Sequence, residues 1–284
     1  KANLMAERPI EIREKILNTI KKYNLISPND TVLVAVSGGP DSMCLIDNLL
    51  ALKDILKIKE IAVVHLNHMI RQESETEYVQ EYCKKNEIRC FVKYLDVVKI
   101  AEEEKIGTEE AGRKERYKFF DQVAQEINAN KIAIAHNLND NAETVLMHLL
   151  RGSGITGLCG IKPDREGKYI RPIIKCERAE IEQYCKDQKL DEKYDKTNLD
   201  NKYTRNRIRN ELIPYIKKEF NPNIVETLDR LSDLITDEEQ YMEKVTLEKY
   251  NEIVLEEEND KITIDLKKFN LLDSIIKARI IMYT

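Results

Sequence analysis

The sequence lacks any stretch that approaches the roughly 18 uninterrupted apolar residues of a membrane-spanning helix, and its first residues contain no apolar signal-peptide core. Its six cysteines form neither a C-x-x-C pair nor a zinc-ligand spacing, which argues against the common metal and redox motifs. Buried, reduced thiols are the favoured interpretation. We therefore expect a cytoplasmic protein with no membrane partner.

Two common nucleotide-binding motifs are also absent. No Gly-Lys-Ser/Thr tripeptide completes a Walker A motif, and no G-x-G-x-x-G fingerprint is present. What the chain has instead is Ser37-Gly38-Gly39-Pro40-Asp41-Ser42, which lies between the apolar run 32–36 and the apolar-periodic segment 43–52. A strand, a Gly-Gly turn and a helix start in this order predict an anion-binding loop.

The residue types in this loop suit phosphate chemistry. Glycine lets the backbone approach a ligand closely, and the first N–H groups of a helix, with its dipole, favour an anion. Ser37 and Ser42 add hydroxyl donors, whereas Asp41 would repel phosphate unless a cation such as Mg²⁺ lies between them. An ordinary turn with a capping Ser or Asp is the alternative. The full string resembles the pyrophosphate loop (PP-loop) of N-type ATP pyrophosphatases, which split ATP between the α and β phosphates and adenylate a substrate.

Strand-like and helix-like segments alternate through the first half of the chain. Predicted strands are residues 31–36, 61–66, 90–95 and 131–135, and predicted helices are 10–22, 42–53, 74–86 and 108–128. This alternation predicts an α/β fold, a parallel sheet with helices on both faces, whose ligand lies beyond the strand C-termini. From residue 219 the pattern is mainly helical, with a strand pair near 252–255 and 261–264.

We therefore predict a catalytic domain over residues 1–218 and a small, mainly helical domain over residues 219–284. The apolar run at the end has no helix cap, so we expect the natural polypeptide to continue.

Polar residues follow three of the predicted strands, and they should meet at one edge of the sheet. His65 begins the stretch 65–71, although a histidine there is more often a satisfied core residue. His136 follows the fourth strand, and Asp140 and Glu143 come next, three residues apart on one helix face. Paired carboxylates beside a triphosphate can bind Mg²⁺ or a substrate ammonium, whereas a helix cap with a capping-box acid is the structural alternative.

The net charge of −5 argues mildly against nucleic acid, but the sum hides a basic segment, 202–218, followed by an acidic one, 237–260. Arg205, Arg207 and Arg209 lie within five residues, which predicts a nucleic-acid contact or a partner surface, with a charged helix face as the alternative. Arg151 precedes Gly152-Ser153-Gly154, which suits phosphate. Arg113 projects from the helix 108–128, where such residues usually face solvent.

Taken in order, these residues resemble the tRNA(Ile)-lysidine synthetase family. The match runs from the loop at 37–42 through 65–71, 109–117, 136–144, 151–158, 171–172 and 195–198 to 203–214. The resemblance implies an adenine nucleotide alpha hydrolase-like (PP-loop) fold. It also implies an ATP-dependent carbon–nitrogen ligase that adenylates the carbon-2 oxygen of the wobble cytidine in an isoleucine tRNA with a CAU anticodon. The amine of lysine then displaces AMP, so that the products are lysidine, AMP and pyrophosphate.

The same resemblance implies ATP and Mg²⁺ as cofactors, and free L-lysine and the isoleucine tRNA as partners. Asp41, Asp140 and Glu143 would be the catalytic residues and would hold Mg²⁺ and the lysine ammonium. The implied ATP-binding residues are Ser37, Gly38, Gly39, Pro40, Asp41, Ser42, His65, Arg113 and His136. The implied tRNA-binding residues are Arg151, Arg205, Arg207 and Arg209.

The chain departs from the family pattern at two positions, because Asn139 stands where a second acid is usual and Asn141 where Gln is usual. Family members commonly carry a further C-terminal tRNA-binding domain, for which little room remains here. A tRNA 2-thiolation enzyme of the PP-loop family is one rival, disfavoured by the missing cysteine pair. A non-catalytic nucleotide-binding tRNA adaptor is another, disfavoured by the three carboxylates. The oligomeric state, with a homodimer as one alternative, and the discrimination against methionine tRNA stay open.

Overall fold

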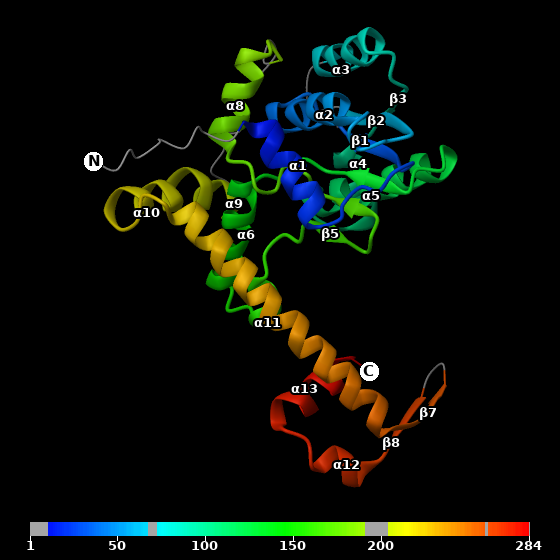
Figure 1. Cartoon of the computed structure of the whole chain (residues 1–284), viewed down its shortest axis with the longest axis vertical. Coiled ribbons are helices and arrows are strands. Elements are labelled where there is room, and N and C mark those ends of the chain that lie inside the picture. Colours follow the sequence, from blue (N-terminus) through cyan, green and yellow to red (C-terminus); the bar gives the residue numbers. More distant parts are fainter. Residues whose placement is uncertain (1–10, 68–72, 191–203, 259–260, 284) are drawn as a thin grey trace, which may run out of the picture.

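The computed structural model describes residues 11–67, 73–190, 204–258 and 261–283 (Figure 1). Its central sheet has the strand order β3-β2-β1-β4-β6-β5, in which only the β5–β6 pair is antiparallel. The strands are β1 Thr31–Ala35, β2 Glu60–Asn67, β3 Cys90–Tyr94, β4 Lys131–Ala133, β5 Asp164–Arg165 and β6 Tyr169–Ile170. β1 lies in the middle of the parallel strands, so its C-terminal end opens the candidate site.

Strand β1 shows why helices cover both faces of the sheet. The three central residues, Val32, Leu33 and Val34, are fully buried, and they alternate between two clusters because successive side chains of a strand point to opposite faces. Val32 and Val34 belong to the larger cluster, whereas Leu33 belongs to the smaller one on the other face. Because both faces of β1 are covered, its sequence from Val32 on is a continuous apolar run rather than an alternation of apolar and polar residues.

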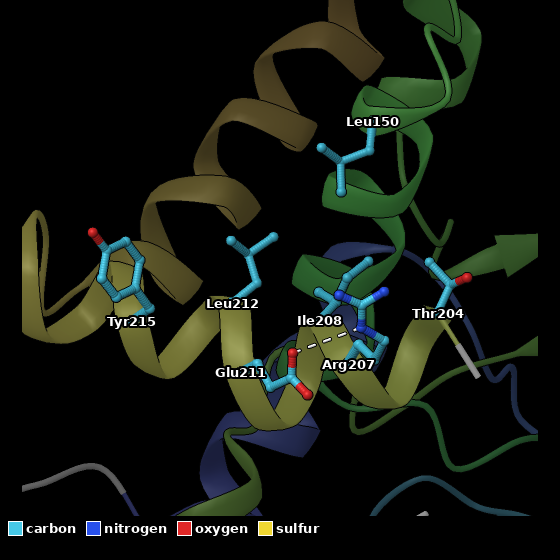
Figure 2. Close-up of a pocket in the computed structure, with 7 residues that line it drawn as sticks. All are labelled: Leu150, Thr204, Arg207, Ile208, Glu211, Leu212 and Tyr215. Atoms are coloured by element: carbon cyan, nitrogen blue, oxygen red, sulfur yellow. Dashed lines mark ion pairs between the residues drawn. The ribbon is translucent and has the colours of Figure 1, made fainter. Parts of the chain in front are cut away.

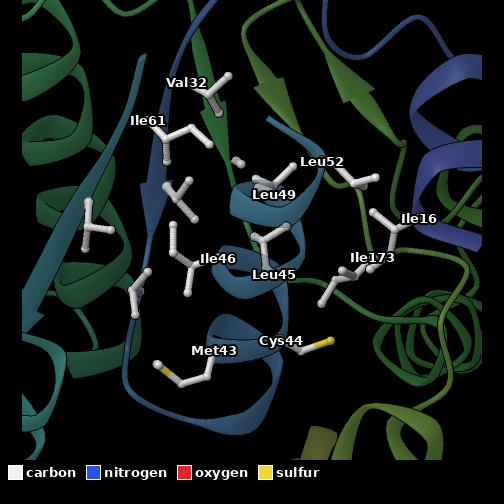
Figure 3. Packing of buried hydrophobic residues seen from close by; sticks show 14 of the residues in the cluster. Ile16, Val32, Met43, Cys44, Leu45, Ile46, Leu49, Leu52, Ile61 and Ile173 are labelled. Carbon is white, nitrogen blue, oxygen red and sulfur yellow. The ribbon is translucent and has the colours of Figure 1, made fainter. Parts of the chain in front are cut away.

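Helices α1, α2, α3 and α8 cover the face with the larger cluster, which Figure 3 shows at close range around Ile16, Leu45, Leu49 and Ile173. Helix α5 covers the other face, and α4 lies beside it. These helices are α1 Ile12–Lys22, α2 Pro40–Leu52, α3 Glu73–Lys85, α4 Val97–Glu104, α5 Thr108–Glu126 and α8 Arg178–Asp187. The predicted α/β fold with helices on both faces of a mostly parallel sheet is confirmed.

A helical layer lies beyond the sheet and is built around α6. It comprises α6 Leu138–Leu150, α7 Ile155–Leu158, α9 Thr204–Arg207, a π-helical segment Ile208–Leu212, α10 Ile213–Glu219 and α11 Ile224–Ile253. Figure 1 shows α11 leaving this layer and running to a small C-terminal unit. That unit contains β7 Val254–Glu258, β8 Lys261–Ile264, α12 Leu266–Asn270 and α13 Ser274–Tyr283.

The long helix α11 takes part in both regions, because it contacts α6 and α7 and also α12 and α13. The domain division after residue 218 falls at the end of α10 and stays a prediction. The strand predicted at 252–255 begins only at Val254, because α11 continues through Ile253. No helix in the part of the chain that the structure describes combines the length and the apolar character that a membrane span requires.

Candidate functional site

The loop between β1 and α2 is held in shape by Ser42. The Ser42 hydroxyl oxygen accepts hydrogen bonds from the N–H groups of Ser37 (3.0 Å) and Gly38 (3.2 Å), and the hydroxyl donates to the Gly39 carbonyl (3.0 Å). Gly38 has φ +91°, a conformation that residues with a Cβ rarely adopt. The predicted loop therefore forms, with the amino end of α2 at its far side.

Asp41 connects this loop to the helix that carries the other predicted acids. It lies in the first turn of α2, and its Oδ1 accepts a hydrogen bond of 2.9 Å from Asn137 Nδ2. Burial, and then the nearby charge of Asp140, raise the pKa of Asp41 from 3.8 to about 6. The first loop and the start of α6 thus meet, as the strand order requires.

The amino end of α6 is closed by a capping box between Asn137 and Asp140. The Asp140 N–H donates to Asn137 Oδ1 (2.9 Å), and the Asn137 N–H donates to Asp140 Oδ2 (3.0 Å). Asp140 is therefore the capping-box acid that the structural alternative predicted at this helix start. Its other oxygen, Oδ1, lies 3.2 Å from guanidinium nitrogens of both Arg178 and Arg209, so the same side chain also takes part in a charged network.

Glu143 is the buried centre of this network, with a side chain that is 0% exposed. Arg209, from the π-helical segment, binds it through Nε (2.8 Å to Oε1) and Nη2 (2.9 Å to Oε2). Arg178, from the start of α8, lies 3.2 Å from Oε1 through its Nη2. Two acids and two arginines therefore neutralise one another beside Asp41. Local π-helical turns are frequent at functional sites, which agrees with this position of Arg209.

His136 lies among positively charged side chains. Its Nδ1 accepts a hydrogen bond of 3.0 Å from Arg171 Nε. Burial, followed by the positive charges of Arg171, Arg205, Arg116 and Arg113, lowers the pKa of His136 to about 3. The structure thus brings the predicted residues Arg113 and His136 into one electropositive region, and it adds Arg205 to that region.

His65 occupies a different kind of position. It is 2% exposed; its Nδ1–H donates to the Val36 carbonyl (2.7 Å), and its Nε2 accepts from the Thr76 hydroxyl (3.0 Å). Both ring nitrogens are therefore bonded, so His65 supports the base of the loop and has no nitrogen left for ATP. The predicted direct contact gains no support. The rest of the predicted stretch, 68–71, lies outside the described residues.

The four predicted tRNA-binding arginines do not form one surface. Arg209 belongs to the carboxylate network, so its assignment to a tRNA phosphate does not fit its two buried acidic partners. Arg205 donates to the hydroxyl of Thr144 (2.9 Å), which lies in the middle of α6. Arg207 is exposed and lies 3.6 Å from Glu211. Arg151 follows the last turn of α6, a 13-residue helix, about 20 Å from its first turn.

A pocket of about 580 Å³ lies between the end of α6 and the segment from α9 to α10 (Figure 2). It is lined mainly by apolar side chains, namely those of Leu150, Ile208, Leu212 and Tyr215, together with Thr204, Arg207 and Glu211. None of the predicted ATP-binding residues lines the pocket. Of the four predicted tRNA-binding arginines, Arg207 is the one in its lining. The pocket therefore lies beside Arg207 and away from the PP-loop residues. The 195–198 stretch of the family resemblance lies outside the described residues.

Sequence reasoning missed Arg178 and left Arg171 without a role. Arg178 is the first residue of α8, where the helix dipole disfavours a cation. A positive charge at that helix start is the one signal in the sequence that could have indicated an acidic partner elsewhere. Arg171 follows the short strand β6, which carries no periodic signal.

Comparison with known proteins agrees with this architecture. The profile of the PP-loop domain family matches residues 10–216 of the chain. This chain belongs to the PP-loop domain family. The U34-tRNA thiolase NcsA from Methanococcus maripaludis with its [4Fe-4S] cluster has a similar structure, with a TM-score of 0.61 at 20% sequence identity over 78% of each chain. At that identity the likeness supports the fold alone.

Curated PP-loop relatives are considerably more similar in sequence. The tRNA(Ile)-lysidine synthase of Clostridium acetobutylicum is 50% identical over 238 residues, which cover 83% of this chain and 51% of that protein. The tRNA(Ile)-lysidine synthase of Clostridioides difficile is 44% identical over 273 residues, which cover 95% of this chain and 59% of that protein. The chain thus spans about half the length of the curated relatives that it matches.

Membership of the PP-loop family implies that the chain uses ATP. Within the described ranges no group of three or more His, Cys, Asp or Glu side chains is placed to bind a metal ion, so the three-carboxylate site stays a prediction. Asp140 and Glu143 are paired with arginines instead. A Mg²⁺ ion that arrives with ATP phosphates needs only one or two carboxylates. Asp41 fits that smaller role, because no ion pair of Asp41 is found among the described residues, and burial together with the charge of Asp140 raises its pKa.

Proposed function

We propose that this PP-loop protein is a tRNA(Ile)-lysidine synthetase, which joins lysine to carbon 2 of the wobble cytidine in an isoleucine tRNA with a CAU anticodon. The observation that carries the proposal is the hydrogen bond between Asn137 and Asp41. It joins the PP-loop directly to the start of a helix with two further acids, so nucleotide and amine chemistry would share one site. The names of the relatives supply the substrates.

The electropositive region is the proposed site of the ATP phosphates. The loop N–H groups and the start of α2 would hold the departing pyrophosphate, with His136, Arg113 and Arg205 around it. Bound through Asp41, Mg²⁺ would neutralise charge that develops on the pyrophosphate. The cytidine oxygen would then attack the α phosphate, and the base would become activated for displacement of AMP.

The network of two acids and two arginines is the proposed lysine site. Free lysine carries two ammonium groups and one carboxylate, so a site with alternating acids and arginines matches its charges. Asp140 and Glu143 would hold ammonium groups, and Arg178 or Arg209 would bind the carboxylate. One of the acids would accept the proton that the amine loses on attack.

The tRNA is proposed to approach from the side of Arg205, Arg207 and Arg151. Arg207 lies at the pocket between α6 and α10, and Arg205 connects this side to the electropositive region. Arg209 is left out of this surface because it is paired with Glu143.

One assay tests the assignment. The full-length protein is incubated with ATP, Mg²⁺, labelled lysine and a CAU-anticodon isoleucine tRNA transcript, and label in the tRNA is measured. We expect incorporation that depends on ATP and is absent with a transcript whose wobble cytidine is replaced by uridine. No incorporation under conditions where ATP binds would remove the lysidine assignment.

The same assay separates the alternatives. A thiolase would replace the carbon-2 oxygen with sulfur and incorporate no lysine, and a non-catalytic adaptor would release no AMP. The cysteines nearest the loop, Cys44, Cys176 and Cys185, are all buried, and burial raises the pKa of the thiols of Cys44 and Cys176. Because sulfur chemistry requires a thiolate, the geometry does not favour thiolation.

A further inference from the structure

The contact between Arg171 and His136 fixes where the imidazole carries its proton. A guanidinium can only donate hydrogen bonds, so the Nδ1 atom that faces Arg171 Nε at 3.0 Å must be unprotonated. The neutral ring then carries its proton on Nε2. Arg171 is itself 6% exposed, and its backbone N–H donates to the Pro163 carbonyl (2.8 Å), so its position is fixed by the fold.

The positively charged surroundings of His136 favour a neutral imidazole ring, which can still donate one hydrogen bond. Arg113, Arg116 and Arg205 already place positive charge around the ring, so a further cation would be repelled rather than stabilised. His136 also directly precedes Asn137, which bonds Asp41 at the PP-loop. No hydrogen bond to its Nε2 is found among the residues that the structure describes.

We propose that Arg171 is a positioning residue that holds His136 in the Nε2–H tautomer and so presents a neutral hydrogen-bond donor to a phosphate of ATP. The inference rests on the proposed function only for the identity of the ligand. The tautomer itself is a property of the protein before ATP binds, so it can be tested separately.

The first test is nuclear magnetic resonance of the protein with ¹⁵N-labelled histidine. Long-range proton–nitrogen correlation distinguishes the two tautomers, and the chain has only four histidines. His65 provides an internal reference, because its bond to the Val36 carbonyl requires the opposite, Nδ1–H tautomer. The His136→Gln variant assigns the His136 signals. We expect pure Nε2–H at His136; an Nδ1–H pattern would overturn the proposal.

The second test uses Arg171→Met, with Arg165→Met as the matched control. Arg165 is a nearby arginine whose guanidinium lies 4.2 Å from the centre of the Tyr169 ring rather than on His136. We expect Arg171→Met to give a mixture of His136 tautomers and to slow AMP formation about 10- to 100-fold, the range for losing one hydrogen bond to a charged group. Arg165→Met should leave the His136 signals unchanged.

Arg171→Lys separates positioning from charge. Lysine keeps the positive charge but not the planar guanidinium geometry. Compared with Arg171→Met, it should therefore recover more of the folding stability, while the His136 tautomers stay mixed and AMP formation stays slow. A folded Arg171→Met or Arg171→Lys protein with a pure Nε2–H ring and normal AMP formation would overturn the proposal. AMP formation without lysine transfer would instead contradict the proposed function and leave this inference intact.

Discussion

Among single residues, Asp41 shows most clearly how a charge proposed to bind Mg²⁺ can destabilise the ligand-free protein. Its carboxyl has a folded-state pKa of about 6 against 3.8 as the usual value, so the folded protein holds this proton more tightly than the unfolded chain. Stability from this group is complete below the usual pKa and is lost as the pH rises through the folded pKa. Above pH 6 the ionised side chain therefore destabilises the ligand-free protein, by up to about 3 kcal/mol.

Asp41→Asn should consequently raise the melting temperature of the ligand-free protein at pH 8 and change it little near pH 4. An amide oxygen at this position can still accept the hydrogen bond from Asn137, so the loop keeps its connection to α6. The same variant should lose AMP formation, because the negative charge proposed to bind Mg²⁺ is gone. Thermal unfolding at the two pH values checks this. Equal melting temperatures of variant and wild type at pH 8 would mean that the ionised Asp41 carboxylate does not destabilise the protein.

At the scale of elements, the Glu143–Arg209 pair attaches the π-helical segment Ile208–Leu212 to α6. Removing one partner of a buried pair leaves an uncompensated charge, which costs about 3–5 kcal/mol. Glu143→Gln and Arg209→Met should each destabilise the protein strongly. The double variant should lose clearly less than the sum, because neither charge then remains buried alone. Urea denaturation of the four proteins measures the coupling.

Arg207→Met serves as the control for this cycle, because its ion pair with Glu211 is exposed and should contribute about 0–1 kcal/mol. Additive losses for Glu143→Gln and Arg209→Met would contradict a direct coupling. Arg178 also binds Glu143, so Glu143 keeps one cationic partner in Arg209→Met, and the measured coupling should be smaller than for an isolated buried pair.

The elements also show what the sequence could predict. The loop at 37–42 and the strands before it were predictable because a buried parallel strand, a Gly-Gly turn and a helix start have local signatures. The two-residue strands β5 and β6 have no such signature, and only their pairing with β4 reveals them. The acids of α6 were identified, but their partners Arg178 and Arg209 come from residues 35 and 66 positions beyond Glu143. Such contacts depend on the fold and not on any local pattern.

For the molecule as a whole, the net charge of −5 repels RNA, so tRNA affinity should depend on a few basic residues. We expect Arg205→Gln, Arg207→Gln and Arg151→Gln each to weaken tRNA binding. Each should also reduce the slope of log affinity against log salt concentration by about 0.7–0.9 for every phosphate that the variant no longer neutralises. Binding titrations at several salt concentrations check this. Lys261→Gln, an exposed lysine on the C-terminal hairpin, is the control, and an equal loss of affinity there would indicate nonspecific attraction.

The connection between the catalytic region and the C-terminal unit depends on Glu239 of α11. This side chain is 7% exposed and binds Arg279 of α13 through both oxygens (2.8 and 3.0 Å), while the Thr156 hydroxyl of α7 donates to it at 3.1 Å. Glu239→Gln should lower the free energy of opening α13 by about 2 kcal/mol, which is about 30-fold faster amide hydrogen exchange there. Strands β1 and β2 should keep their protection, because the sheet core does not include this contact.

Glu252→Gln is the matched control, since it makes the same change on the same helix in an exposed pair with Lys249 and should leave exchange unaltered. The bond to Arg279 also lowers the pKa of Glu239, so its stabilising contribution is present above the usual carboxyl pKa and is lost as the pH falls through the lower, folded value. Acid below pH 4.5 should therefore release α13 in the wild type before it affects the sheet. Exchange that accelerates equally in α13 and in β1 would instead mean that α11 joins the two regions into one cooperative unit.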